Sequence, residues 1–153
     1  MRPSQRRMHR QKQIKVMKRI AIILTKNLNK GAAANVAALL MGQAALQVPD
    51  IYNSQPVPDR DGNLHAAIRY STVLLEANGA ESLLNFVNRI KAEFSTLTSF
   101  VFSQTGQGLH NAFEQYQAEL ANKTTAELIP VGIIVAGDDA TVRQATKKFS
   151  LLK

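Results

Sequence analysis

Apolar and polar segments alternate along this chain with the lengths of strands and helices. The run from Ile20 to Thr25 is almost wholly apolar, which is typical of a strand buried on both faces. From Gly31 to Leu46, small and apolar residues recur every three or four positions, which predicts a helix able to approach a sheet closely. The residues of this stripe are Ala33, Val36, Ala37, Leu40 and Ala44.

The same alternation continues through the second half of the chain. We predict strands near 19–25, 71–77, 98–103 and 128–136, and helices near 31–46, 80–94, 108–121 and 139–147. In the third helix, Leu109, Phe113, Tyr116 and Leu120 are expected to form an inward stripe. The pattern predicts an α/β fold, a three-layer α/β/α sandwich around a mixed, mainly parallel sheet of about four strands.

Between the first helix and the second strand, residues 55–70 depart from this alternation. Pro56-Val-Pro58 precedes Asp59-Arg-Asp-Gly62, which predicts a turn between two extended arms. The segment begins like a calcium-binding loop, but its sixth position is Leu64 rather than glycine and its twelfth is Tyr70 rather than glutamate. A hairpin is therefore the better interpretation.

Composition narrows the class of protein. The 153 residues are 45% hydrophobic and 20% charged, as in a globular domain, and no apolar run approaches the roughly 18 residues needed to cross a bilayer. Cysteine is absent, which excludes disulfides and thiolate chemistry. Because no signal peptide is recognisable, we expect a cytoplasmic protein without a membrane partner.

The net charge of +8 is concentrated at the amino terminus. Residues 1–19 carry eight of the 19 basic residues and no acid, so the remainder balances 11 basic against 11 acidic residues. We expect residues 1–16 to be a disordered basic extension, either dispensable or an over-long start, and residues 17–153 to be a single α/β domain. The alternative is an arm that binds nucleic acid non-specifically through phosphates; the neutral domain itself is not expected to bind nucleic acid.

The junction after the first strand is the best candidate for a ligand site. It places Lys30 and the free amides that follow Gly31 at the carboxyl end of a strand, where open α/β sheets bind ligands. We expect Asn35, Gln104 and Thr105 to add orienting hydrogen bonds around a small anionic or polar ligand.

Two further residues are expected at this crevice. Right-handed crossovers in a parallel sheet would bring the turns that contain Lys30, Gln104 and Asp138 to one edge. His65 would reach the rim if the hairpin folds over that edge as a lid. The alternative is that these turns are solvated helix caps, and for Asp138 and Asp139 a capping role is the favoured interpretation.

We predict neither a metal site nor a cofactor. His9, His65 and His110 do not have the spacing of metal ligands. No nucleophile elbow surrounds Ser103, and the turn from Thr105 to Gly108 lacks the Lys-Ser/Thr of a phosphate-binding loop.

Four segments together resemble a small bacterial family. They are Arg19 to Asn35, Pro58 to His65, Val73 to Ala77 and Val131 to Gly137. The family is known as domain of unknown function 2000, and it is similar in fold to type-two peptidyl-tRNA hydrolases. The resemblance covers residues 17–153, and it implies a mixed four-stranded core sheet flanked by helices and a tendency to form homodimers.

The hydrolase relatives carry a Gly-Lys-Gly-Lys turn before the first helix and an Asp-Ala-Gly-x-Thr turn after the third strand. The matching turns here are Asn29-Lys-Gly-Ala32 and Ser103-Gln-Thr-Gly106, so one lysine remains and the aspartate is missing. Lys30 could stabilise an oxyanion, but Gln104 cannot act as a base. Two hypotheses follow: a module that binds a small anionic or polar metabolite, which we favour, and a hydrolase of esters or amides with a degenerate site.

Overall fold

The central strand of the sheet is β1 (Lys18–Thr25), which follows the basic segment. In the computed structural model, which describes residues 17–109 and 112–153, every residue of β1 from Ile20 onward is buried. A strand covered on both faces needs apolar side chains at consecutive positions, which explains the unbroken apolar run.

Four other strands complete the sheet in the order β5–β6–β1–β4–β7. They are β4 (Ser71–Ala77), β5 (Thr98–Ser103), β6 (Pro130–Asp138) and β7 (Ser150–Leu151). β4 is parallel to β1, whereas β6 is antiparallel to it and pairs Asp138 with Lys18. β5 is antiparallel to β6, and β7 is antiparallel to β4.

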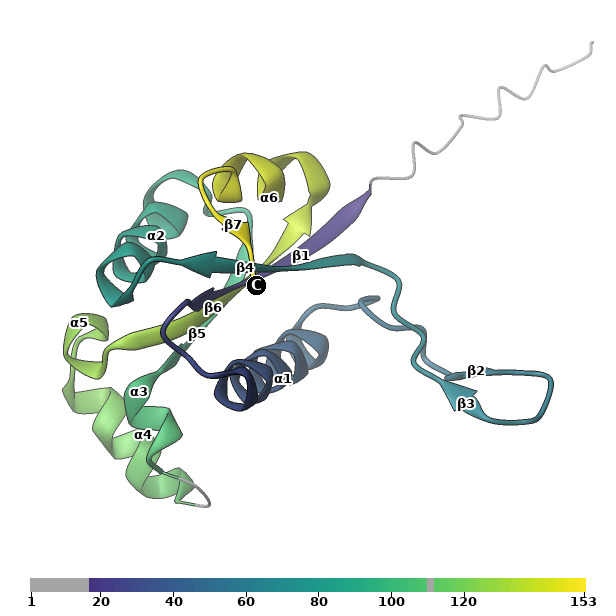
Figure 1. Ribbon diagram of the computed structural model, residues 1–153, viewed down its shortest axis with the longest axis horizontal. Coiled ribbons are helices and arrows are strands. Elements are labelled where there is room, and N and C mark those ends of the chain that lie inside the picture. The colour runs from purple at the N-terminus through teal and green to yellow at the C-terminus, as the bar shows by residue number, and fades with distance from the viewer. Residues whose placement is uncertain (1–16, 110–111) are drawn as a thin grey trace, which may run out of the picture.

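The sheet is mixed, as predicted, but it has five strands rather than four and is not mainly parallel. Among the described strands, β1 and β4 form the one parallel pair of neighbours. The prediction assumed a crossover helix between β5 and β6. Instead the connection forms α3 (Gln104–Gln107), α4 (Phe113–Asn122) and α5 (Thr125–Leu128) beside the sheet (Figure 1), so the chain turns back and β6 returns antiparallel.

The helix predicted at 108–121 starts later and does not bury its expected stripe. Leu109 precedes α4, Phe113 is 66% exposed, and no residue of α4 is fully buried. Tyr116 is half-buried, and this burial raises the pKa of its hydroxyl. Apolar residues do recur at helical spacing in this segment, but α4 lies beside the sheet and has little surface against which to pack them. The other predicted strands and helices lie within two residues of their observed bounds.

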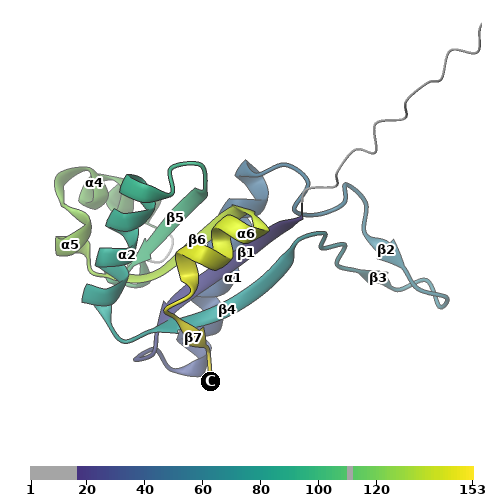
Figure 2. The same cartoon turned by 90° about the horizontal axis from the view of Figure 1, so that it is seen from above.

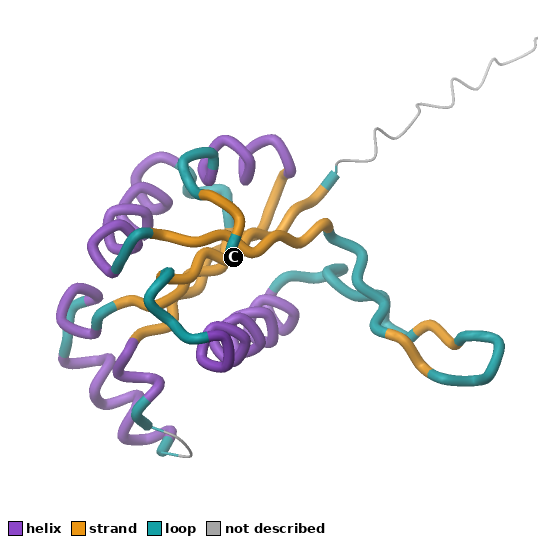
Figure 3. The backbone as a smooth tube through the Cα atoms, in the orientation of Figure 1, coloured by secondary structure: helices purple, strands orange, loops and turns teal. Residues whose placement is uncertain are grey.

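Helices cover both faces of the sheet, which confirms the three layers (Figures 1 and 3). α1 (Lys30–Gln47) packs on β1, β5 and β6, and α2 (Ala80–Glu93) and α6 (Asp139–Thr146) pack on the other face. Ile22 of β1 joins the core under α1, and its neighbour Ile23 joins the core under α2 and α6. Successive strand residues point to opposite faces, so one short strand supplies both cores.

The predicted hairpin is present as β2 (Val57–Pro58) and β3 (Leu64–His65). Asp59 Oδ1 accepts hydrogen bonds from the backbone N–H groups of Asp61 and Asn63 at 2.9 and 3.0 Å, and Gly62 takes a positive φ of 87°. Residues 55–66, which we call the hairpin arm, project from the body of the molecule before the start of β4 (Figures 1 and 2). No helix within the described residues is long and apolar enough to cross a membrane.

Candidate functional site

The sheet topology separates the predicted site residues into two groups. The carboxyl ends of β1, β4 and β5 lie at one edge, and Lys30 and Gln104 follow there. Asp138 ends β6 at the opposite edge, where it pairs with Lys18. We predicted that Lys30, Gln104 and Asp138 lie at the same edge of the sheet. For Asp138 this prediction is wrong, because β6 runs antiparallel to β1.

Asp138 and Asp139 act as cap and ion-pair partner at the start of α6. Asp138 Oδ2 accepts from the backbone N–H of Thr141 at 3.2 Å and from its hydroxyl at 3.1 Å. The Asp139 carboxylate accepts hydrogen bonds from Arg19 Nε and from Arg143 Nε, each at 2.8 Å. These two bonds hold the pKa of the Asp139 carboxyl below its usual value, and the bond from Arg19 has the larger effect. The capping interpretation of this pair is confirmed.

His65 lies in the hairpin arm, away from the edge that follows β1. Its Nε2 is 2.7 Å from Asp59 Oδ2, and this contact lowers the pKa of the Asp59 carboxyl. The arm projects on the side where β4 begins, so the expectation that it closes over Lys30 as a lid is wrong (Figure 2). His9 and His110 lie outside the described residues, as does the basic extension over residues 1–16.

Gln104 and Thr105 lie at the expected edge but not beside Lys30, because β6 separates β5 from β1. The backbone N–H of Gln104 donates to Ile129 at 2.8 Å, and the Thr105 hydroxyl donates to the Leu128 carbonyl at 3.4 Å. These two residues therefore fasten α3 to the chain that enters β6.

A cavity of about 190 Å³ lies at the start of α1, and we call it the lysine cavity. Its polar lining consists of Lys26, Lys30, Glu76 and Lys153. Its apolar lining consists of Leu24, Leu28, Ala33, Ala34, Ala37, Leu74 and Leu152. The site thus combines an apolar wall with three cationic groups and one carboxylate.

The packing of α1 creates this space. Because α1 packs on β1, β5 and β6, Leu74 on the same face of β4 stays 39% exposed. The helix face toward β4 carries Lys30 and then three alanines at the spacing of one helical face, so little side-chain volume fills the gap. The backbone N–H of Leu152 donates to the Leu74 carbonyl at 3.1 Å, which closes the outer wall. Gly31 and Asn35 belong to α1 but do not line the cavity.

The electrostatics of the cavity favour an anion. Among the side chains of the lining, three lysines against one glutamate leave an excess of two positive charges. The first turn of α1 holds no acidic residue, and its partial positive charge points to the same end. Asn29 Oδ1 caps the helix by accepting from the Ala32 N–H at 2.8 Å.

Sequence reasoning identified Lys30 but missed Lys26, Glu76 and Lys153. Lys26 directly follows β1, which was a usable signal. Glu76 lies in β4 opposite Leu24 of β1, so the predicted strand at 71–77 was also a usable signal. Lys153 could not be placed, because its position depends on β7 pairing with β4, and a two-residue strand leaves almost no pattern in a sequence.

The fold and the site define an α/β domain with a mixed five-stranded sheet and a basic cavity at the carboxyl ends of its parallel pair. Residues 18–153 match the protein family of unknown function DUF2000, and the chain belongs to it. The structure of Atu0240, a protein of unknown function from Agrobacterium tumefaciens C58, is similar with a TM-score of 0.76 at 21% identity, over 88% of this chain and 96% of that one. No curated protein matches the chain.

Proposed function

We propose that this protein binds a small anion with a short apolar body, such as an aliphatic carboxylate, in the lysine cavity. The observation that carries the proposal is the pairing of Lys26 and Lys30 with an alanine- and leucine-lined wall. Burial of a short alkyl chain would supply hydrophobic free energy, and the lysines would hold the charged head.

The position of the cavity supports the same proposal. After β1 the chain forms α1 on one face of the sheet, and after the neighbouring β4 it forms α2 on the other face. In open α/β sheets such a change of face leaves a crevice at the carboxyl ends of the strands, and ligands bind there.

The test compares charged and uncharged ligands of one shape. Butanoate and hexanoate are expected to raise the melting temperature, because a ligand that binds the native state stabilises it. Butanamide and hexanamide, which have the same shape without the charge, are expected to have little effect.

The Lys30→Ala variant is expected to bind hexanoate about tenfold more weakly, the lower end of what a charge-assisted hydrogen bond contributes. Lys91→Ala removes the same charge from the exposed last turn of α2 and is expected to bind as the wild type does. Equal binding of the acid and the amide, or an unchanged affinity in Lys30→Ala, would contradict the proposal.

The hydrolase hypothesis rests on the resemblance to type-two peptidyl-tRNA hydrolases and gains no specific support. An ester hydrolase needs a base or an oriented water, and the position after β5 is occupied by Gln104, which cannot take a proton.

The cytoplasmic location of the protein also stays a prediction.

We also propose that the chain forms a homodimer through the hairpin arm. The arm projects from the domain as a hairpin of two short strands, and its apolar residues Val57 and Leu64 are 52% and 68% exposed. Val57 pairs with His65 and Leu64 with Pro58, so Val57 and Leu64 lie on opposite faces of the hairpin. An isolated two-stranded hairpin is marginally stable, and a second copy packed on either face would stabilise it.

A further inference from the structure

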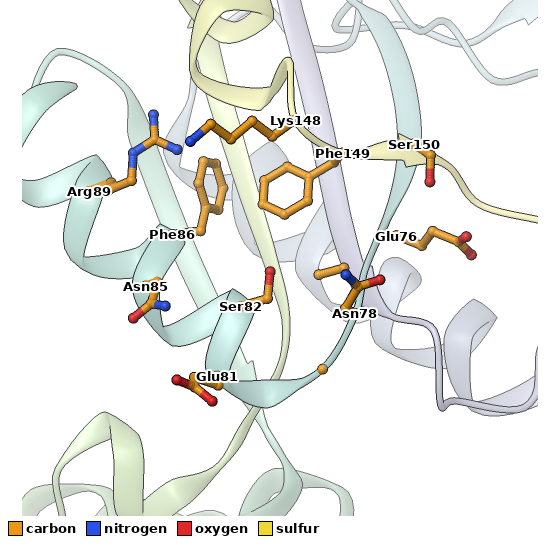
Figure 4. Close-up of a pocket in the computed structure, with 12 residues that line it drawn as sticks. Glu76, Asn78, Glu81, Ser82, Asn85, Phe86, Arg89, Lys148, Phe149 and Ser150 are labelled. Carbon is orange, nitrogen blue, oxygen red and sulfur yellow. The ribbon is translucent and has the colours of Figure 1, made fainter.

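A second and larger cavity lies on the other face of the sheet, where β4 ends and α2 begins. Its volume is about 770 Å³, within the range of about 300–1,000 Å³ typical of small-molecule sites. It is bounded by α2 on one side and by the segment between α6 and β7 on the other (Figure 4). None of the site residues predicted from the sequence lines it.

Two cationic side chains line one end of this cavity. Arg89 from α2 and Lys148 from the segment after α6 extend toward one another above the rings of Phe86 and Phe149 (Figure 4). Among the described residues, Lys148 has no carboxylate within ion-pair distance. Arg89 has a long contact of 3.8 Å from its Nε to Glu93 Oε2, an exposed pair of the kind that contributes little.

An anion that lies between these two like charges would lower their mutual repulsion. A phosphate monoester carries about −1.5 to −2 charges at pH 7, whereas a carboxylate carries one, so a phosphate matches the two cations better. The guanidinium can donate two parallel hydrogen bonds to phosphate oxygens, and the ammonium adds a third.

The rest of the cavity fits the body of such a ligand. Ser82, Asn85, Phe86 and Arg89 occupy one face of α2, so polar donors and acceptors continue from the cationic end toward Asn78 at the end of β4. Phe149 packs edge-on against Phe86, with ring centroids 5.0 Å apart at 79°, and this fixes one wall. Two carboxylates, Glu76 and Glu81, also line the cavity; Glu76 points away from the cations, and Glu81 lies at the other end of the α2 face (Figure 4).

We propose that this cavity binds a phosphate monoester of about mononucleotide size, with the phosphate held between Arg89 and Lys148. Hydroxyl and amide groups of the sugar or base would then contact Ser82, Asn85 and Asn78. This site lies on the opposite face of the sheet from the lysine cavity, although Glu76 belongs to both linings, and it does not depend on the function proposed there.

Calorimetric titration with inorganic phosphate, ribose 5-phosphate, AMP and adenosine tests the proposal on the full chain. AMP is expected to bind more tightly than ribose 5-phosphate, which should bind more tightly than phosphate, and adenosine should bind at least tenfold more weakly than AMP. The affinity for AMP should fall as salt is raised, since the contact is between exposed charges.

Lys148→Ala and Arg89→Gln are each expected to weaken AMP binding at least tenfold. Lys147→Ala, which removes the exposed neighbouring charge that does not line the cavity, should leave the affinity unchanged. Loss of AMP binding in Lys30→Ala but not in Lys148→Ala would place the phosphate in the lysine cavity and overturn the proposal, as would adenosine binding as well as AMP. Absence of binding by all four probes at millimolar concentration would overturn it too.

Discussion

Lys30 occupies a position that is unfavourable for stability. It is the first residue of α1, where the helix dipole is positive and an acidic side chain would be preferred, and it shares a cavity with Lys26 and Lys153. Removing its charge should therefore leave the free energy of unfolding unchanged or slightly higher. A lysine that lowers the stability of the fold and lines a cavity is better explained by binding of a ligand than by a structural role.

Asp139 has the opposite role, because its charge stabilises the fold. Its pKa is lowered first by Arg19 and then by Arg143, so its contribution is complete above the unfolded pKa near 3.8 and is lost as the pH falls through the lower folded value. Asp139→Asn is expected to lower the melting temperature at pH 7, and the difference from the wild type should vanish at a pH well below 3.8.

Thermal denaturation of both proteins between pH 2 and 7 measures this difference. Asp61→Asn is the control, because it removes an exposed carboxylate from the hairpin arm that makes no ion pair among the described residues. A difference for Asp139→Asn that persisted unchanged to pH 2 would show that packing rather than charge is responsible.

At the scale of elements, the approach of α1 to β6 depends on a single missing side chain. A Cβ atom at Gly132 of β6 would lie 2.9 Å from both Leu24 Cδ2 and Val36 Cγ1 and 3.1 Å from Leu40 Cδ1. Gly132→Ala is therefore expected to lower the free energy of unfolding by about 1–3 kcal/mol through overpacking.

Gly42 supplies the matched control for that substitution, since it lies within α1 and a Cβ there has no neighbouring atom within 4 Å. Gly42→Ala should raise the free energy of unfolding by about 0.5–1 kcal/mol through helix propensity. Urea denaturation of both variants gives the two values. Two substitutions with the same sign would contradict the proposed contact between α1 and β6.

The same elements show how far the sequence could predict this molecule. Ile20 to Leu24 and the stripe that contains Val36 and Leu40 mark a buried strand and its helix, because those patterns follow directly from burial. The direction of β6 could not be predicted, since an apolar run reads alike in parallel and antiparallel strands. Because β6 was assumed to be parallel to β1, Asp138 was predicted at the wrong edge of the sheet. The part of the lysine cavity that β7 brings into place was not predicted, because β7 is only two residues long.

At the scale of the whole molecule, the hairpin arm projects from the domain and exposes apolar side chains, which the packing of a single chain does not explain. If two copies associate through it, sedimentation at micromolar concentration should give the mass of a dimer. Val57→Ser combined with Leu64→Ser should shift the equilibrium toward monomer, whereas Phe113→Ser, an equally exposed apolar residue on α4, should not. A wild-type monomer, or dissociation caused by the α4 variant instead, would contradict this assembly.

The two cavities lie on opposite faces of the sheet at the end of β4 and share Glu76 in their linings. The most direct test of the central claim, that the lysine cavity is an anion site, is an amide chemical-shift titration of the wild-type protein with hexanoate and, separately, hexanamide. We expect hexanoate alone to shift the resonances of Lys30, Ala33, Ala34, Ala37 and Leu152, which share the cavity wall. Shifts confined to Gln104 and Thr105, shifts of equal size with the amide, or no shifts at millimolar hexanoate would contradict the claim.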